Sequence, residues 1–325
     1  MRGLRSFWIA IVALSYLPGA ALAGPITEFI PQANGEVKWS EGVLRATGFG
    51  VRPKDAESPA QARLLARSAA IADAYRNMAQ VINEVRVTAN TTVERHLTAS
   101  DLLRLSVQAY VRGAEVIEER DNPDGTYSVA LQVGLFGEKG LTGLVLPSLL
   151  RIPPKVSAGS PPPGITLDQP SPVPPGPVMA SREILGTPTL SPEAALLTPA
   201  TDEGPFTGVI IDARGLNIQP AMSPRIYDPA GQEIYGTVNV DASFAEEVGV
   251  AGYMGTIRAA MALPRVGNHP LVIRAVGTPD RFHRYLTLSA EDAQRLLAAD
   301  ARSRFLEKCA VAIVVDERRA RDEAK

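Results

Sequence analysis

The chain has 325 residues, a formal net charge of −2, one cysteine, 27 prolines and 27 glycines. Hydrophobic residues make up 45% of it and charged residues 21%, a globular balance that excludes a wholly disordered chain. The near-neutral charge argues against a nucleic-acid partner, and a single cysteine excludes an intramolecular disulfide and any zinc site that needs paired thiolates.

Residues 1–23 predict a signal peptide. Arg2 and Arg5 precede an apolar stretch, and Ala21-Leu22-Ala23 forms a small-x-small cleavage site. The alternative is an uncleaved anchor helix, but the stretch is short for a membrane span and is broken by Pro18-Gly19. No cysteine lies near the cleavage point, so no lipid anchor is expected. We therefore predict that the protein is exported to the periplasm.

Proline dominates the middle of the chain, because residues 152–205 contain 14 of the 27 prolines. Proline fixes φ and restricts its predecessor, which favours an extended, semi-rigid backbone. We predict a proline-rich linker at 151–205, with a docking ligand for another protein as the alternative. The linker separates a domain at 36–150 from one at 206–316, and a charged tail follows at 317–325. Few contacts are expected to cross the linker, so the two domains should fold independently.

The first domain opens with a predicted strand at 43–51. Ser58 as N-cap, Pro59 at the first helical position and Gln61 two residues later predict the start of a helix of about 25 residues. We expect its arginines to form a solvated face, with a contact to anionic lipid as the alternative; they are Arg63, Arg67 and Arg76.

The rest of the first domain is predicted as strand, helix and hairpin. Alternating residues predict a strand at 85–93, and Ser100 or Asp101 opens a second helix. Two further strands, at 111–119 and 126–135, flank Asn122-Pro123-Asp124-Gly125, a strong turn signal. The order β-α-β-α-β-β predicts a two-layer α/β sandwich.

Four segments of this domain carry a family resemblance. They are ATGFG at 46–50, QARLLARSAAIADAYRNMAQVI at 61–82, VRVTANTTV at 85–93 and YVRGAEVIEERDNPDGTYSVALQV at 110–133. Together they resemble the LPP20-type envelope domain, over about residues 41–135, which is similar to the N-terminal domain of the flagellar assembly protein FlgT. The resemblance implies a bacterial cell-envelope protein with a non-enzymatic binding or assembly role, with a flagellum-related role as one option. Its partners would be envelope or flagellar proteins, and no catalytic residue comes with the family.

The second domain mixes strands and helices. Strands are predicted at 206–212, 271–276, 285–288 and 311–315, and Asp228-Pro229-Ala230-Gly231 predicts a hairpin turn. A short helix is expected through Tyr253 and Met261, and a longer one from Ser289 to about Lys308. This half resembles the C-terminal part of uncharacterised LPP20-containing proteins. The fold class that we predict is therefore α+β, with two domains, the second a mixed α/β layer domain.

Three polar residues stand where the second domain's strands begin or end. Asp212 and Arg214 follow its first strand at a glycine turn, and Arg225 precedes the hairpin. Ligand sites of α/β sheets lie at strand ends, so these residues are a candidate contact for a ligand or partner. The alternative is turn chemistry with a surface ion pair, which contributes little to stability.

The sequence supplies no other chemistry. The three histidines, His96, His269 and His283, are not at metal-ligand spacing, and no nucleophile elbow or phosphate loop is present. Cys309 begins an apolar strand and is expected to be a buried, inert thiol. We predict no catalytic, cofactor-binding or metal-binding residue and no cofactor. The alternative function is a periplasmic small-ligand-binding protein or a hydrolase that uses the second domain.

Overall fold

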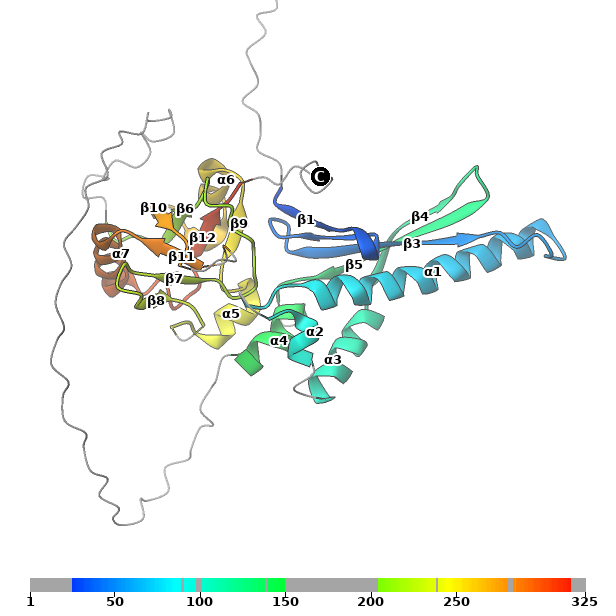
Figure 1. Cartoon of the computed structure of the whole chain (residues 1–325), viewed down its shortest axis with the longest axis horizontal. Helices are drawn as coiled ribbons and strands as arrows, with labels where there is room; N and C mark the ends of the chain where they lie inside the picture. Colours follow the sequence, from blue (N-terminus) through cyan, green and yellow to red (C-terminus); the bar gives the residue numbers. More distant parts are fainter. Residues whose placement is uncertain are drawn as a thin grey trace, which may run out of the picture.

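The computed structural model describes residues 25–88, 91–97, 101–137, 139–149, 204–237, 239–279, 283 and 285–316. The predicted signal peptide and the charged tail lie outside these residues, as does the predicted linker apart from residues 204 and 205. The described residues form two sheets with helices packed on them, which confirms the α+β, two-domain fold class (Figure 1).

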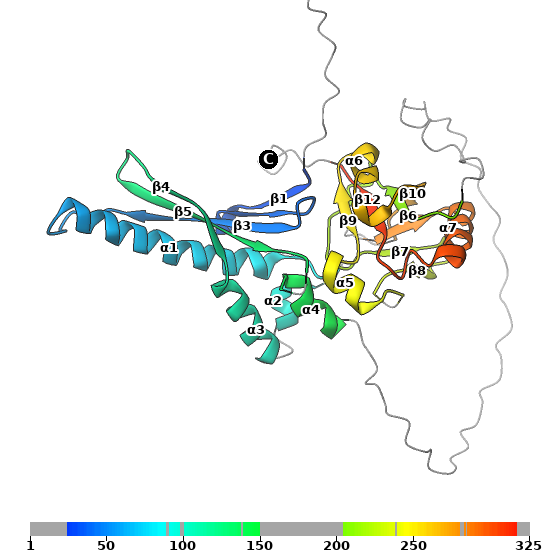
Figure 2. The same cartoon turned by 180° about the vertical axis from the view of Figure 1, so that it is seen from behind.

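The first sheet is antiparallel and has five strands in the order β1-β2-β3-β5-β4. Helix α1 (Pro59–Glu84) lies along one face of it, as Figure 2 shows. The strands are β1 (Thr27–Ile30), β2 (Gly35–Lys38), β3 (Val43–Val51), β4 (Glu115–Asp121) and β5 (Thr126–Gly134). Around this sheet lie a 3-10 turn at Pro31–Ala33 and helices α2 (Val93–Leu97), α3 (Asp101–Arg112) and α4 (Leu141–Leu149).

The predicted start of α1 is confirmed at the level of its cap. The Ser58 side chain accepts a hydrogen bond from the backbone N–H of Gln61 at 3.1 Å, and Gln61 Oε1 accepts from the N–H of Glu57 at 2.6 Å. The first bond satisfies a donor that the helix N-terminus leaves without an intrahelical partner, and the second ties the residue before the cap to the first turn. The predicted hairpin is confirmed too, because β4 and β5 meet at Gly125, whose φ of 84° suits glycine.

Helix α1 lies unusually close to strand β3, because small residues face each other. A Cβ atom added to Gly48 would lie 2.1 Å from the backbone nitrogen of Ala74, and one added to Gly50 would lie 2.0 Å from the carbonyl oxygen of Ala66. Ala66, Ala70 and Ala74 are fully buried in this contact. The ATGFG segment is therefore glycine-rich because the helix backbone occupies the space of the missing side chains.

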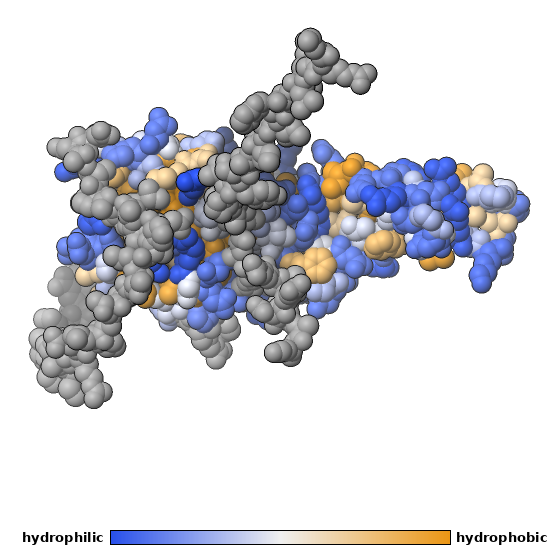
Figure 3. All heavy atoms as spheres, turned by 90° about the horizontal axis from the view of Figure 1, so that it is seen from above, coloured by the Kyte–Doolittle hydropathy of each residue, from blue (hydrophilic) through white to orange (hydrophobic). Residues whose placement is uncertain are grey.

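The arginines of α1 pair with the hairpin. Arg67 forms two hydrogen bonds with Glu119, at 2.7 and 2.6 Å, and Arg63 contacts Asp121 at 3.2 Å. Arg76 pairs with Asp73 on its own helix. The distal halves of α1 and β3, with the β4–β5 hairpin, project from the molecule as an arm (Figure 1). Much of the visible surface of the arm is hydrophilic, with scattered apolar patches (Figure 3).

The element order of the first domain differs from the prediction. The sheet begins at Thr27, before the expected boundary at 36, and the predicted strand at 85–93 is reduced to one bridge between Arg86 and Thr92. Val111 lies in helix α3 instead of starting a strand. The strand is missing because the segment pairs back on itself: the N–H groups of Val87 and Thr88 both donate to the Thr91 carbonyl oxygen, at 2.9 and 3.1 Å. The carbonyl groups of Arg86 and Val87 accept hydrogen bonds from the second domain.

The second sheet has seven strands in the order β8-β7-β11-β10-β6-β12-β9. Strands β10, β6, β12 and β9 are parallel to one another, and β11 joins them antiparallel to β10. The strands are β6 (Gly208–Asp212), β7 (Arg225–Tyr227), β8 (Glu233–Tyr235), β9 (Gly252–Met254), β10 (Pro270–Gly277), β11 (Tyr285–Leu288) and β12 (Val311–Val314). The predicted central position of the apolar segment is confirmed, because β12 lies between β6 and β9 with every residue buried.

Three helices and a 3-10 turn accompany this sheet: α5 (Ala242–Val248), α6 (Ile257–Met261), the turn at Pro264–Val266 and α7 (Ala290–Ser303). The sequence did not predict α5, and it placed Tyr253 in a helix, whereas Tyr253 lies in strand β9. Helix α7 begins at the predicted Ser289 cap but ends at Ser303, because Arg304 adopts a left-handed conformation. No helix in the described ranges has the length and apolar character needed to cross a bilayer.

The two domains are joined by a packed interface, contrary to the expectation of few contacts. The N–H groups of Met222 and Ser223 donate to the carbonyls of Arg86 and Val87, both at 2.9 Å, and Ser40 Oγ donates to the Tyr253 carbonyl at 2.8 Å. One cluster of buried residues runs through both sheets. The composition of the linker could not reveal this interface, because the contacts join segments on opposite sides of it, such as Arg86-Val87 and Met222-Ser223.

Arg265 reinforces the interface from inside. Burial lowers the pKa of its guanidinium, which donates to carbonyl oxygens that include those of Val248 and Val311. The same guanidinium lies 6.0 Å from the centre of the Phe136 ring of the first domain. Gly249 also abuts this ring, since a Cβ there would lie 2.4 Å from Phe136.

Candidate functional site

Asp212 and Arg214 form an ion pair at the end of strand β6. Arg214 Nε and Nη2 donate to the two carboxylate oxygens of Asp212 at 2.8 and 2.9 Å, and the backbone N–H of Arg214 donates to Oδ1 at 3.2 Å. Asp212 is 2% exposed. Burial acts to raise the pKa of Asp212, but the hydrogen bonds from Arg214 outweigh it, so that the pKa lies below its usual value.

This pair stands at the carboxyl edge of the parallel strands. Arg274 of β10 pairs with Asp212 in the register of strands β10 and β6. Two contacts fix the loop that follows β6. The N–H of Gly215 donates to Asp316 Oδ2 at 2.8 Å, and His283 Nδ1 lies 3.0 Å from the Leu216 carbonyl oxygen. These contacts give Asp212 and Arg214 a structural role, and a ligand contact by either residue stays a prediction.

Arg225 lies elsewhere, so the three candidate residues do not form one site. It begins strand β7, which strands β11 and β10 separate from β6. Its guanidinium contacts Glu233 at 3.4 Å and lies 5.8 Å from the centre of the Tyr285 ring. Burial opposes the charged form, but Tyr227 and Glu233 outweigh it and raise the pKa of Arg225.

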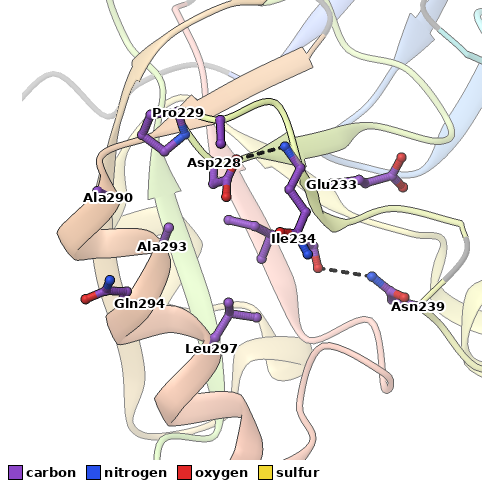
Figure 4. Close-up of a pocket in the computed structure, with 11 residues that line it drawn as sticks. Asp228, Pro229, Glu233, Ile234, Asn239, Ala290, Ala293, Gln294 and Leu297 are labelled. Atoms are coloured by element: carbon purple, nitrogen blue, oxygen red, sulfur yellow. Dashed lines mark hydrogen bonds between the residues drawn. The ribbon is translucent and has the colours of Figure 1, made fainter. Parts of the chain in front are cut away.

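A pocket opens on the far side of Glu233, between α7 and the β7–β8 hairpin. Its volume is about 420 Å³, within the range of ligand sites. Figure 4 shows Ile234 on the hairpin and Ala293 and Leu297 on the helix around this space, whereas the Glu233 side chain turns away from them. Asp228 lies at the rim and accepts a hydrogen bond from the N–H of Gln232 at 2.8 Å.

A second hollow of about 460 Å³ continues the pocket along the helix, because the two share Ile234, Asn239 and Leu297. We call the combined concavity the α7 groove. Leu297 is 50% exposed at its centre. The remaining lining residues are Asp228, Pro229, Ala230, Gln232, Glu233, Val240, Ala290, Ala293, Gln294, Asp300, Arg304, Leu306 and Glu307.

The charges of the α7 groove are mainly acidic. Its lining has four carboxylates and one cation, Arg304, which contacts Glu307 at 2.7 Å. Arg225 balances Glu233 from outside the groove. The carboxylates left without an ion pair among the described residues are Asp228 and Asp300, and Asp300 Oδ1 accepts from the N–H of Leu306 at 2.8 Å. The groove therefore combines an apolar floor with uncompensated negative charge.

Sequence reasoning missed this groove. Leu296 and Leu297 are neighbours in the helix predicted from Ser289, yet Leu296 is fully buried and Leu297 is half exposed. Successive helical residues are about 100° apart around the axis, so a doublet can be divided between core and surface. It need not be, because Val81 and Ile82 of α1 are both fully buried, and the doublet alone could not place Leu297 on the surface. The hairpin side of the groove had no sequence signal, since only the fold brings residues 228–239 to α7.

One further hollow, of about 500 Å³, lies in the first domain, between the end of α3, β5 and residues 136–140. Its lining holds one acid, Glu115, and one base, Lys139, so that it has no net charge. Tyr110 Oη donates to the Gly134 carbonyl at its wall. This hollow lacks the uncompensated charge that distinguishes the α7 groove.

The other candidate groups for chemistry are separate in the described residues. No cluster of three or more histidine, cysteine or acidic side chains suited to a metal lies among them. Cys309 is buried, and burial raises the pKa of its thiol to about 11, which keeps it protonated at neutral pH. His269 stacks on Phe206 with ring centres 4.8 Å apart.

Two family models match separate segments of the chain. Residues 53–134 match the LPP20 lipoprotein family. This confirms the predicted LPP20-type domain and indicates an envelope-associated protein; the likeness to FlgT stays a prediction. The match runs from just before α1 to the end of β5, and residues 208–317, the second sheet and its helices, match the second domain of Treponema pallidum Tp0624.

The chain is also similar to part of acetate kinases. It is 30% identical over 97 residues to acetate kinase of Bacillus cytotoxicus, which is 30% of this chain and 24% of that enzyme. It is 30% identical over 82 residues to acetate kinase of a Bacillus cereus strain, 25% of this chain and 21% of that enzyme. The chain thus spans about a quarter of the length of these curated relatives.

Proposed function

We propose that this protein is a non-enzymatic binding or assembly protein of the bacterial cell envelope and that the α7 groove holds its partner. The observation that carries the proposal is the half-exposed Leu297 at the centre of a groove with an apolar floor. Concave surfaces lined mainly by apolar side chains with a few polar groups are typical of binding sites. The LPP20 match supports the part of the proposal that places the protein in the cell envelope. We also propose that the signal peptide exports the protein to the periplasm.

The packed interface between the domains suits such a role. Because the two sheets share one buried cluster, the arm and the α7 groove are held on one framework. A bound partner would therefore be presented in a fixed direction relative to the arm. The arm also carries exposed apolar residues, such as Phe49 and Leu64, but the groove combines an apolar floor with a concave shape and two carboxylates that have no ion pair among the described residues.

Site-specific photo-cross-linking in cells tests the proposal. A photoreactive benzoylphenylalanine at position 297 should form a conjugate with one defined envelope protein, and the same group at the exposed Arg302, outside the groove, should not. An excess of the wild-type protein without the photoreactive group should compete for the partner and suppress the conjugate. The Leu297→Lys variant without the photoreactive group should not suppress it. Equal conjugates from both positions would contradict the proposal, and a flagellar protein in the conjugate would establish the predicted flagellar link.

The enzymatic alternative has its own test. Phosphoryl transfer is not part of the proposal, because the likeness to acetate kinases covers a quarter of those enzymes. Purified protein should neither phosphorylate acetate nor hydrolyse generic ester, phosphate or peptide substrates. An activity that disappears in Asp212→Ala or His283→Ala would overturn the non-enzymatic proposal.

A further inference from the structure

We infer that the α7 groove recognises an extended polypeptide segment in which two cationic side chains flank one aliphatic side chain. The inference rests on the proposed function and names the chemistry of its partner. It follows from three properties of the groove, namely its apolar centre, its two uncompensated carboxylates and the blocked edge of strand β8.

The centre of the groove requires an aliphatic side chain. Ile234, Ala293 and Leu297 lie around the hollow, and all three side chains are apolar (Figure 4). Filling this space removes apolar surface of both molecules from water, which stabilises the complex in proportion to the area buried. Leu297 contributes most, since half of its side chain is exposed before binding.

The two ends of the groove require positive charge. Asp228 lies at the end next to Ala290 and Ala293, and Asp300 lies at the other end of the lining. Both carboxylates accept backbone hydrogen bonds, from Gln232 and Leu306, and no arginine or lysine is paired with either among the described residues. A cationic group at each end would supply the missing counter-charge, and an anionic membrane surface would be repelled.

The length of the groove selects the conformation of the partner. Its lining on α7 runs from Ala290 to Asp300, ten positions, which at about 1.5 Å per residue is about 15 Å. In an extended chain, side chains at i, i+2 and i+4 point to one face, and the outer two lie about 13 Å apart. A cation-x-aliphatic-x-cation sequence therefore presents its three side chains at a matching spacing.

The edge of the sheet argues against simple strand addition. Strand β8 ends the seven-stranded order, but it has only three residues, and Asn239 Nδ2 already donates to its Ile234 carbonyl at 3.2 Å, so an added strand would find few backbone partners. Recognition must then come from side chains. A second copy of this chain is a poor occupant through α1, because Arg63 and Arg67 already pair with Asp121 and Glu119.

The test uses short labelled peptides and the full chain. A fluorescein-labelled heptapeptide Ser-Lys-Ser-Leu-Ser-Lys-Ser should bind in fluorescence anisotropy at low salt. Its acidic counterpart, with Glu for Lys, and a peptide with Ser for Leu should each bind at least tenfold more weakly. Raising the salt concentration should weaken the complex, because the contributing charges are solvent-exposed.

Matched variants locate the site. Asp228→Asn with Asp300→Asn keeps the acceptors for Gln232 and Leu306 and removes two charges, and it should weaken binding at least tenfold. The control, Glu57→Gln with Glu247→Gln, makes the same charge change at positions outside the groove and should bind as the wild type does. Unchanged thermal unfolding of both variants would show that folding is intact.

Several outcomes would overturn the inference. The inference fails if the acidic peptide or the peptide without leucine binds as tightly as the basic peptide, or if the Asp228→Asn, Asp300→Asn variant binds the basic peptide as the wild type does. It also fails if spermidine at the same concentration as the peptide displaces it, because the ligand would then be a small polyamine. The cross-linking experiment separates the two proposals. A conjugate at position 297 without a basic segment refutes only this inference, whereas peptide binding without any conjugate in cells refutes only the proposed function.

Discussion

The indole ring of Trp39 packs edge-on against the ring of Tyr253, with centroids 5.7 Å apart and planes at 69°. Trp39 belongs to the first domain and Tyr253 to strand β9 of the second, and both are 1% exposed. Tyr253 Oη also donates to the Ala221 carbonyl at 3.0 Å. This aromatic contact joins the first domain to the second at the packed interface between them.

Replacing Trp39 with alanine should destabilise both domains together. Truncating a buried tryptophan leaves a cavity and costs about 3–5 kcal/mol of unfolding free energy. Urea unfolding followed by circular dichroism should show one transition in both proteins, with a lower midpoint in the variant. Phe29→Ala, at a side chain that is 57% exposed, is the control and should change stability little. Loss of one domain's signal alone would show that the domains unfold separately.

Cleavage between the domains should not separate them. A specific protease site introduced within residues 164–176, outside the described residues, would cut the chain without touching the interface. The two fragments should elute together in size-exclusion chromatography, because backbone hydrogen bonds at Met222 and Ser223 and the shared core hold them. The same cut in a Trp39→Ala, Arg86→Ala background should release them, since Arg86 pairs with Glu28 and donates to the Pro220 carbonyl at 3.0 Å. Separate elution of the wild-type fragments would contradict the packed interface.

Gly48→Ala should be strongly destabilising, by more than about 2 kcal/mol, because overpacking against backbone atoms has no cheap relaxation. The added methyl group would lie 2.1 Å from the Ala74 nitrogen and 2.4 Å from the Ala70 carbonyl oxygen. Gly277→Ala is the matched control in a strand, where an added Cβ has no atom within 4 Å. Thermal unfolding of the two variants measures the difference, and equal melting temperatures would refute the close helix–strand contact.

The Asp212–Arg214 pair predicts a pH dependence. The folded-state pKa of Asp212 is lowered, so its contribution to stability is present above the unfolded value of about 3.9 and is lost as the pH falls through the folded value. Asp212→Asn should therefore cost about 2 kcal/mol at pH 7 and progressively less below pH about 4. Urea titrations of wild type and variant across this range test it. A difference that stays constant with pH would show that the charge of Asp212 does not contribute.

The predicted export signal is tested by the intact mass of the protein recovered from the periplasm. The mature chain should start at Gly24, because cleavage is expected after Ala23. Trp39 would then be the one tryptophan of the mature chain, which would let its fluorescence report on the interface. A mass that includes Met1 would favour the anchor-helix alternative.

The sequence by itself determined several local elements and the LPP20-type resemblance of the first domain. The Ser58 cap and the turn at 122–125 each depend on residues that are close together in the sequence. The local sequence pattern therefore predicts the start of α1 and the β4–β5 hairpin. The all-apolar segment of β12 likewise predicts a covered strand, because only a strand buried on both faces lacks polar positions.

Only the tertiary structure decided which of these elements meet. Residues 86 and 87 have strand periodicity, yet their carbonyls bond to Met222 and Ser223, a pairing that no local pattern encodes. Arg225 was grouped with Asp212 because both flank strands, but the strand order places two strands between β7 and β6. The α7 groove arises in the same way: Leu297 stays exposed because the fold brings Ile234 beside it without covering it, and that depends on contacts between segments about sixty residues apart.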